Sequence, residues 1–166
     1  NLKSPFMREI HIPLVFKAYE DLNEMSQSDQ ELMLQAVENR KNAYAPYSRF
    51  RVGAALLLEN GIIIHGNNQE NAAYPSGLCA ERVAIFQAGA IYPGVKILKI
   101  AISATSDDKI VSSPIPPCGG CRQSIAEYEI KQEAPIEILF MGEQGEIFHS
   151  DSLKSLLPLI FDKNFL

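Results

Sequence analysis

The 166-residue sequence contains only three cysteines and three histidines, and it lacks both a run of basic residues and a long apolar segment. The odd number of cysteines excludes a fully paired disulfide framework. No apolar stretch approaches the roughly 18 residues of a membrane helix, so we expect no membrane contact. The formal net charge is -5 and the 15 basic residues are scattered, which argues against binding of DNA or RNA. These absences favour a small-molecule ligand.

The start of the chain has no apolar core of the kind found in secretory signals, because it begins Asn1-Leu2-Lys3-Ser4-Pro5. Free thiols are most common in reducing compartments. We therefore expect a cytoplasmic protein. With 46% hydrophobic residues, the chain suits one domain that buries roughly 70% of its unfolded surface.

The first 27 residues are predicted to form an N-terminal extension, 1–27, to a main domain that spans 28–166. Apolar residues in the extension alternate with other residues, as they do in a strand. An extra edge strand, an interface arm and a partly disordered tail are all compatible with this pattern. The alternating residues are Ile10, Ile12, Leu14 and Phe16.

Capping, turn and periodicity signals divide the main domain into helices and strands. Ser28 and Glu31 form a capping-box pattern that predicts the start of a helix. Asn60-Gly61 between two β-rich runs predicts a hairpin. The predicted order is a helix over 28–42, strands over 52–58 and 62–65, a helix over 79–89 with Val83, Phe86 and Ala90 inward, a strand over 97–104, a helix over 119–128, a strand over 136–141 and a short helix over 150–157. This order indicates an α/β fold in which a mixed sheet has helices on its faces.

All three cysteines lie where predicted helices begin. Cys79 opens the helix over 79–89, and Cys118 and Cys121 open the helix over 119–128. Helix N-termini favour thiolates, which are ligands for Zn²⁺. A structural zinc site usually has four protein ligands, whereas a catalytic site has three and an open position, so three cysteines indicate an open site. For each motif taken alone, a structural half-site, a redox pair or a buried cysteine is the simpler alternative.

Charged residues flank the cysteines. Glu81 follows Cys79 by two residues and could act as a general acid and base beside the open position; an exposed glutamate in a first helical turn is the alternative. Three thiolates and one Zn²⁺ leave a net negative charge, which would weaken the acidification of a bound water. We hypothesise that at least one of Arg82 and Arg122 offsets this charge by a hydrogen bond to a ligand sulfur. A surface arginine is the alternative for each.

The cysteine motifs are Cys79-Ala80-Glu81-Arg82 and Pro117-Cys118-Gly119-Gly120-Cys121-Arg122-Gln123. Two further motifs precede them, Ala45-Pro46-Tyr47-Ser48-Arg49-Phe50-Arg51-Val52-Gly53-Ala54-Ala55 and Asn68-Gln69-Glu70-Asn71-Ala72-Ala73-Tyr74-Pro75. Together the four motifs resemble the zinc-dependent cytidine deaminase family, in its small homotetrameric branch with three cysteine ligands. The similarity runs from about residue 44 to residue 161.

The resemblance implies a single-domain, three-layer α-β-α fold with a mixed five-stranded sheet and a catalytic domain over 28–166. It implies hydrolytic deamination of cytidine and deoxycytidine to uridine and deoxyuridine with release of ammonia, a reaction of pyrimidine salvage. One Zn²⁺ per chain would be held by Cys79, Cys118 and Cys121. Zinc-bound hydroxide would attack C4 of the base, with Glu81 as the proton shuttle.

The resemblance also implies substrate and subunit contacts. Asn68 and Glu70 would bind the ribose hydroxyls. Phe50 would stack beside the pyrimidine, and the backbone around Ala80 would recognise the polar edge of the base. Phe161 matches an aromatic residue that reaches into a neighbouring subunit's site, in a homotetramer with shared active sites. Without the family, these side chains would be interpreted as loop or packing residues.

Two segments depart from the family pattern. The extension over 1–27 has no counterpart, and the stretch over 107–117 lengthens the approach to the cysteine pair and could alter substrate preference. A deaminase of a blasticidin-type antibiotic is one alternative, although Asn68 and Glu70 favour a plain nucleoside. Nucleic-acid editing is disfavoured, because editing deaminases normally have His in place of Cys79 and a basic surface. A non-catalytic, zinc-stabilised binding module is the alternative from another class.

Overall fold

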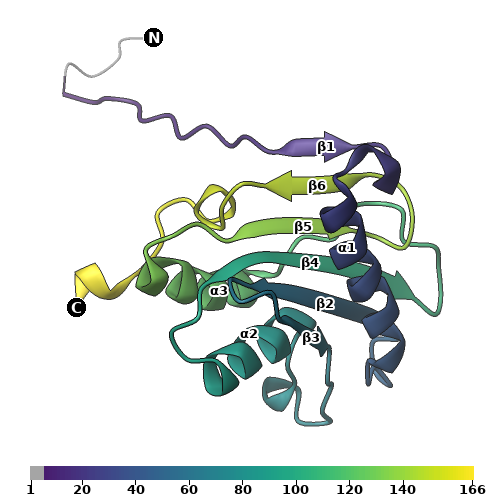
Figure 1. Cartoon of the computed structure of the whole chain (residues 1–166). Helices are drawn as coiled ribbons and strands as arrows, with labels where there is room; N and C mark the ends of the chain where they lie inside the picture. The colour runs from purple at the N-terminus through teal and green to yellow at the C-terminus, as the bar shows by residue number, and fades with distance from the viewer. Residues whose placement is uncertain (1–5) are drawn as a thin grey trace.

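The computed structural model describes residues 6–166 and contains one mixed sheet between two layers of helices (Figure 1). The strand order is β1-β6-β5-β4-β2-β3. β4 and β5 are parallel, and the other neighbouring strands are antiparallel. The strands are β1 (Lys17–Tyr19), β2 (Phe50–Leu58), β3 (Ile63–Asn67), β4 (Ile97–Ser106), β5 (Glu137–Met141) and β6 (Ile147–Ser150).

Helices cover both faces of the sheet, which confirms the expected three-layer α-β-α architecture. α1 (Gln27–Asn39) lies on one face, and α2 (Ala80–Ile91) and α3 (Gly119–Gln132) lie on the other (Figure 1). Each face has its own apolar core, because successive strand residues point to opposite sides. The α1 core includes Leu32, Met33, Ala36, Ala55, Ala101 and Leu139, and the α2–α3 core includes Ala84, Ile85, Ile125, Ala54, Leu56 and Ile102.

The predicted hairpin is confirmed and forms β2 and β3. Gly61 in its turn has a φ of 85°, a conformation that glycine adopts at little cost. Gly66 in β3 has a second role, because α2 approaches the sheet there. A Cβ at this position would lie 2.2 Å from the carbonyl oxygen of Ala80. The first turn of α2 can therefore rest directly on the backbone of β3.

The expectation of five strands is wrong, since the sheet has six. The additional strand, β1, comes from the N-terminal extension and pairs antiparallel with β6. Lys17 lies opposite His149 and its ammonium group is 3.0 Å from the Asp151 carboxylate. The alternating residues before Phe16 form no strand, because β6 ends at Ser150 and offers them no partner. They lie in an exposed arm that leaves the edge of the sheet (Figure 1).

Three local predictions also need correction. The N-cap of α1 is Ser26 rather than Ser28, and its hydroxyl accepts a hydrogen bond from the Asp29 amide. The residues over 150–157 form the end of β6 and a short 3-10 turn over Lys154–Leu156. The buried face of α2 consists of Ala80, Ala84, Ile85 and Ala88, whereas Phe86 and Ala90 are exposed and Val83 is half-buried. Ala80 and Ala84 lie where the helix comes closest to β3, at Gly66, and their small side chains permit this approach.

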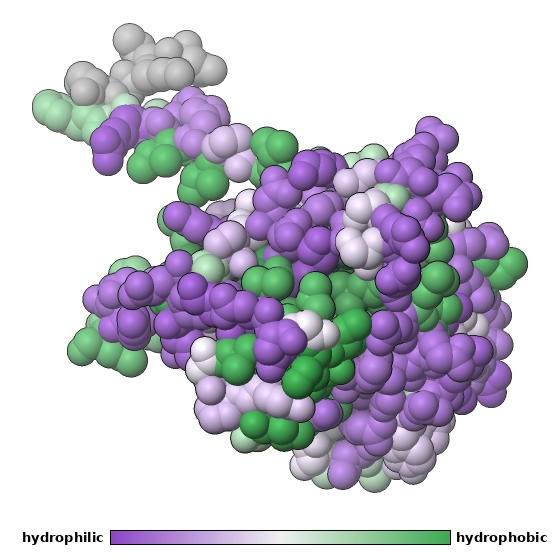
Figure 2. All heavy atoms as spheres, viewed as in Figure 1, coloured by the Kyte–Doolittle hydropathy of each residue, from purple (hydrophilic) through white to green (hydrophobic). Residues whose placement is uncertain are grey.

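The surface is mostly polar in the view of Figure 2, with apolar side chains gathered on the N-terminal arm and near the C-terminus. The exposed apolar residues of these two segments include Ile10, Val15, Leu159 and Phe165, all more than half exposed. Across residues 6–166, no helix combines the length and the hydrophobicity needed to cross a membrane.

Candidate metal centre and substrate cavity

The fold brings the three cysteine sulfurs together at the N-termini of two helices. Cys79 is the N-cap of α2 and Cys118 is the N-cap of α3, while Cys121 lies in the first turn of α3. All three sulfurs lie within 4.8 Å of one another, and those of Cys79 and Cys118 are 3.8 Å apart. Sulfur ligands at about 2.3 Å from a tetrahedral zinc ion would be separated by roughly 3.8 Å. The spacing and the donor set therefore fit one Zn²⁺.

The electrostatic environment of the cluster favours the thiolate of Cys79 and the protonated thiol of Cys121. The pKa of Cys79 is lowered to about 5, chiefly by a hydrogen bond from the Cys121 thiol and further by the Arg82 guanidinium. The pKa of Cys121 is raised in turn, because its proton is held by the Cys79 sulfur. Arg82 Nη2 lies 3.7 Å from the Cys79 sulfur. Arg82 is thus the arginine that contacts a sulfur, as hypothesised.

Arg122 has different partners from those hypothesised. Its Nε donates to the carbonyl oxygen of Pro117 at 2.8 Å, and its Nη1 donates to that of Leu156 at 2.9 Å. These bonds tie the residue before Cys118 to the C-terminal segment. Arg122 therefore supports the backbone around the cysteine pair and makes no hydrogen bond to sulfur within the described chain.

Glu81 lies in the first turn of α2, between Cys79 and Arg82. Its environment differs from that of an ordinary surface glutamate, which is exposed or ion-paired. It is only 5% exposed. Burial, together with the negative charge on Cys79, raises the pKa of its carboxyl to about 7. A carboxyl group with a pKa near neutrality can both accept and donate a proton. The exposed-glutamate alternative is therefore excluded by the burial of this side chain.

A cavity of about 480 Å³ opens beside Cys79 and Arg82. Its size suits a ligand such as a nucleoside, since small-molecule pockets measure roughly 300–1,000 Å³. It includes two of the predicted substrate residues, Asn68 and Glu70. The remaining lining residues are Tyr47, Ser48, Gln69, Asn71, Tyr74, Gly77 and Leu78. Phe50, Ala80 and Glu81 do not line it.

Asn68 and Glu70 are both engaged with the protein backbone. Asn68 Oδ1 accepts from the Val52 amide and its Nδ2 donates to the Phe50 carbonyl, each at 2.8 Å. The Glu70 carboxylate accepts from the amides of Tyr47 and Ser48 and from the Ser48 hydroxyl. Although desolvation would raise its pKa, the hydrogen bonds from Ser48 and Tyr47 hold the pKa of Glu70 below its usual value.

Two aromatic residues of the cavity were not among the predicted site residues. The rings of Tyr47 and Tyr74 meet edge to face with their centroids 5.9 Å apart. Both stand inside the motifs that carry the family resemblance, so the motifs themselves were the signal that could have found them. Phe161 lies outside the cavity of its own chain, is 59% exposed and stacks on Phe165 at 5.6 Å.

A second group of potential ligand atoms lies at the other end of the sheet, where β1, β5 and β6 meet. It consists of Glu137, His149 and Asp151. Lys99 lies 3.5 Å from the Glu137 carboxylate, and Lys17 lies 3.0 Å from the Asp151 carboxylate. The carboxylates are thus already in contact with Lys17, Lys99 and the His149 ring, so this group is explained as a polar network that holds β1.

The α-β-α fold and the open three-cysteine site define a zinc protein of the α/β class. Residues 26–134 match the family model described as the cytidine and deoxycytidylate deaminase zinc-binding region. The chain belongs to this cytidine and deoxycytidylate deaminase family, which confirms the resemblance and its zinc ion.

This chain matches individual relatives over nearly their whole length. A cytidine deaminase of Halalkalibacterium halodurans is 48% identical over 132 residues, which are 80% of this chain and 92% of the relative. One from Sporosarcina psychrophila is 39% identical over 137 residues, 82% of this chain and 93% of the relative. The crystal structure of a cytidine deaminase from Burkholderia pseudomallei superposes with a TM-score of 0.69 at 39% identity, covering 82% of this chain and all of that one.

Proposed function

We propose that this chain is a cytidine deaminase that converts cytidine and deoxycytidine to uridine and deoxyuridine with release of ammonia. The observation that carries the proposal is the buried carboxyl of Glu81 beside three converging cysteine sulfurs, next to a cavity of nucleoside size. The relatives named cytidine deaminases support cytidine as a substrate. This activity would place the chain in pyrimidine salvage, and we expect it in the cytoplasm.

In the proposed reaction, water adds to C4 of the cytosine ring, the bond from C4 to the amino nitrogen breaks, and ammonia leaves. Zinc held by the three cysteines would supply a Lewis acid that makes water nucleophilic at neutral pH. Glu81 would take a proton from the attacking water and deliver it to N3. It would then move the second proton of that water to the leaving nitrogen, which leaves C4 as a carbonyl group.

The sugar contacts proposed for Asn68 and Glu70 are supported by unused hydrogen-bonding capacity. Asn68 spends one donor and one acceptor on β2, which leaves one N–H and one lone pair for a hydroxyl. Glu70 accepts three hydrogen bonds, and a carboxylate has about four acceptor positions. The amide of Ala80, at the start of α2, has no partner within the helix and is suited to the polar edge of the base.

We further propose a catalytic domain over 28–166, preceded by the extension over 1–27, that assembles as a homotetramer with shared active sites. The exposure of Phe161 and its distance from the cavity of its own chain support a contact with a neighbouring subunit. Light scattering coupled to size-exclusion chromatography should give the mass of four chains. A monomer mass over the working concentration range would reject the shared site.

The decisive experiment follows the loss of cytidine absorbance with zinc-loaded wild type and with Glu81→Gln. The variant should keep its zinc and lose about 100-fold to 10,000-fold in turnover, because the amide can no longer shuttle protons. Glu127→Gln, on the exposed side of α3, is the matched control and should retain activity. If wild type deaminates neither cytidine nor deoxycytidine, the proposal is wrong. Turnover of a blasticidin-type antibiotic alone would redirect it to that substrate.

A further inference from the structure

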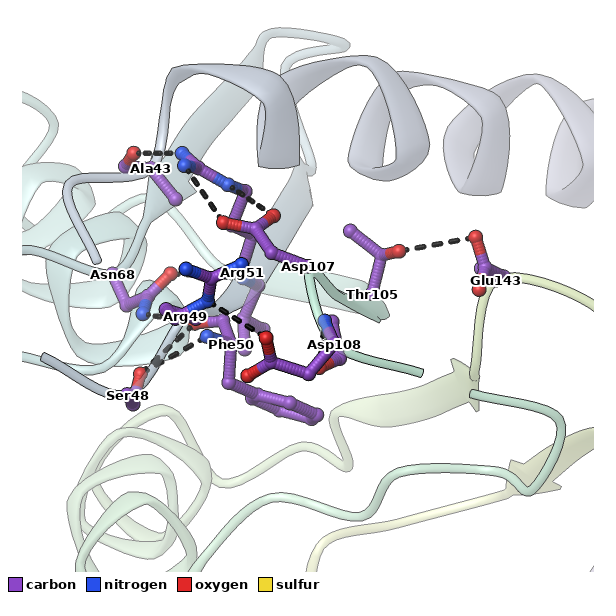
Figure 3. Close-up of polar contacts among 12 residues, drawn as sticks. Ala43, Ser48, Arg49, Phe50, Arg51, Asn68, Thr105, Asp107, Asp108 and Glu143 are labelled. Atoms are coloured by element: carbon purple, nitrogen blue, oxygen red, sulfur yellow. Dashed lines mark hydrogen bonds and ion pairs between the residues drawn. The ribbon is translucent and has the colours of Figure 1, made fainter. Parts of the chain in front are cut away.

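Two arginines and two aspartates meet where β2 begins and β4 ends. Arg49 and Arg51 stand on either side of Phe50, and Asp107 and Asp108 directly follow β4. Figure 3 shows the two carboxylates reaching the two guanidinium groups across this junction. We call these four residues the Arg–Asp clasp. The clasp holds the backbone of Phe50, which does not line the cavity of its own chain and which the family resemblance implies to stack beside the base.

The ion pairs of the clasp differ in strength. Arg51 binds Asp107 with two parallel hydrogen bonds, of 3.0 Å from Nε and 3.2 Å from Nη2. Its third contact, from Nη1, goes to the Ala43 carbonyl at 2.9 Å. The second pair, Arg49 with Asp108, has one contact of 2.8 Å and is more exposed. The forked geometry fixes direction as well as distance, so the Arg51 pair is the main element.

The backbone before Phe50 is in an unusual conformation that the clasp accounts for. Arg49 has a φ of 55°, in the left-handed region that costs a residue with a side chain about 1 kcal/mol or more. The Asp107 amide donates to the Arg49 carbonyl at 2.9 Å. The turn after β4 thus contacts both the main chain and the side chain of Arg49. Ser48, the residue before Arg49, lines the cavity, so several contacts hold a strained conformation directly beside the cavity wall, as expected for pre-organisation.

Two further residues, Asn68 and Ser48, also hold the backbone of Phe50. Asn68 Nδ2 donates to its carbonyl at 2.8 Å, and its amide donates to the Ser48 hydroxyl at 3.1 Å. The ring of Phe50 points away from Arg51 and Asp107 in Figure 3. The clasp therefore leaves the ring free while it fixes the backbone that carries it.

The chain that leaves the clasp leads to the metal centre. Between Asp108 and Cys118 it is anchored at Val111, whose amide donates to Glu143 Oε1 at 3.2 Å and whose carbonyl accepts from the Glu143 amide at 2.8 Å. Thr105 also donates to the Glu143 carboxylate, at 3.1 Å (Figure 3). One short segment therefore connects the support of Phe50 with a zinc ligand.

We propose that Asp107 and Asp108 are positioning residues, which fix Phe50 relative to the cysteine site through Arg51 and Arg49. The inference rests on the proposed function and adds a specificity element that the lengthened 107–117 segment supplies. Neither aspartate touches the cavity, so both act through the arginines. Surface ion pairs that serve only stability would instead leave substrate affinity unchanged.

The test replaces both aspartates, as Asp107→Asn with Asp108→Asn, and measures kcat and KM for cytidine and deoxycytidine. KM should rise about threefold to tenfold for both nucleosides, as expected for the loss of two exposed ion pairs, while kcat stays within about twofold. Zinc content should not change. Exchange of the charges, Arg51→Asp with Asp107→Arg, should recover part of the loss. Glu38→Gln removes the exposed Glu38–Lys41 pair at the C-terminal end of α1 and serves as the matched control.

A KM equal to that of the Glu38→Gln control overturns the inference. A fall in kcat and zinc content by the same factor as the rise in KM also overturns it. Amide hydrogen exchange over 48–52 gives a readout that needs no turnover. It should accelerate in the Asp107→Asn, Asp108→Asn variant, and unchanged exchange would also overturn the inference. A wild type inactive on both nucleosides would reject the proposed function instead, with the exchange result still deciding whether the clasp fixes Phe50.

Discussion

At the scale of single residues, the charge of the cysteine cluster depends on Arg82. Its guanidinium lies 3.7 Å from the Cys79 sulfur, and its Nε is buried without a hydrogen-bond partner in the described chain. Arg82→Ala should lower zinc affinity about tenfold to 100-fold, because groups that contact metal ligands have effects of this size. Competition with a chromophoric chelator measures the affinity.

The conservative variant Arg82→Lys is the control, since it keeps the positive charge and loses the planar fork of donors. It should recover part of the zinc affinity. If Arg82→Ala has the zinc affinity and turnover of wild type, the arginine does not tune the site.

Short-range sequence was sufficient for the residues around Cys79. Cys79, Glu81 and Arg82 lie within one turn of α2, so their order along the chain already places them together. The partners of Arg122 could not be predicted in this way, because Leu156 is distant in sequence and only the fold brings it close. The backbone contacts of Asn68 were missed for the same reason.

At the scale of secondary-structure elements, one buried carboxylate links three parts of the fold. Glu129, in α3, is 8% exposed and accepts hydrogen bonds from the amides of Ile136, Leu153 and Lys154 at 2.8, 2.7 and 2.9 Å. Glu129→Ala should lower the free energy of unfolding by about 3 kcal/mol, because it leaves buried donors unsatisfied. Urea denaturation measures the loss.

Glu127→Ala on the same helix is the control for this prediction. Its side chain is exposed, so the free energy of unfolding should change by no more than about 0.5 kcal/mol. Equal stability of the two variants would show that Glu129 does not join the elements.

The elements were largely predictable where local signals agree with the tertiary structure. The β2–β3 hairpin formed around Asn60-Gly61 as predicted, because its turn residues and flanking strands give the same signal. The buried face of α2 was predicted wrongly. Apolar size suggested Phe86, but the close contact with β3 places Ala80 and Ala84 against the strand, and this depends on a strand that precedes the helix in the sequence. The sequence alone left the structure of the β1 segment undecided for a similar reason, because the pairing of β1 depends on the end of β6.

At the scale of the whole molecule, the metal should add stability without being required for folding. It would join the N-termini of α2 and α3, but neither core cluster includes one of its cysteine ligands. Removal of zinc with a chelator should lower Tm by roughly 5–15 °C, as expected when a tightly bound ligand is lost from a chain of this size. Differential scanning calorimetry measures the shift.

Restoring zinc should return Tm to its starting value. Far-ultraviolet circular dichroism at 25 °C should show the same helix and strand content with and without chelator. Collapse of that spectrum on zinc removal, or no change in Tm, would contradict a stabilising but dispensable metal.

The close approach of α2 to β3 at Gly66 has a consequence for how such a site can change. A methyl group there would strike the Ala80 carbonyl and push the start of α2 outward, and Cys79 and Glu81 would move with it. The distance between the nucleophile and the substrate thus depends on Gly66, a strand residue that contacts neither of them. Selection for a larger or smaller substrate can change the loops around the cavity, but residue 66 must remain a glycine.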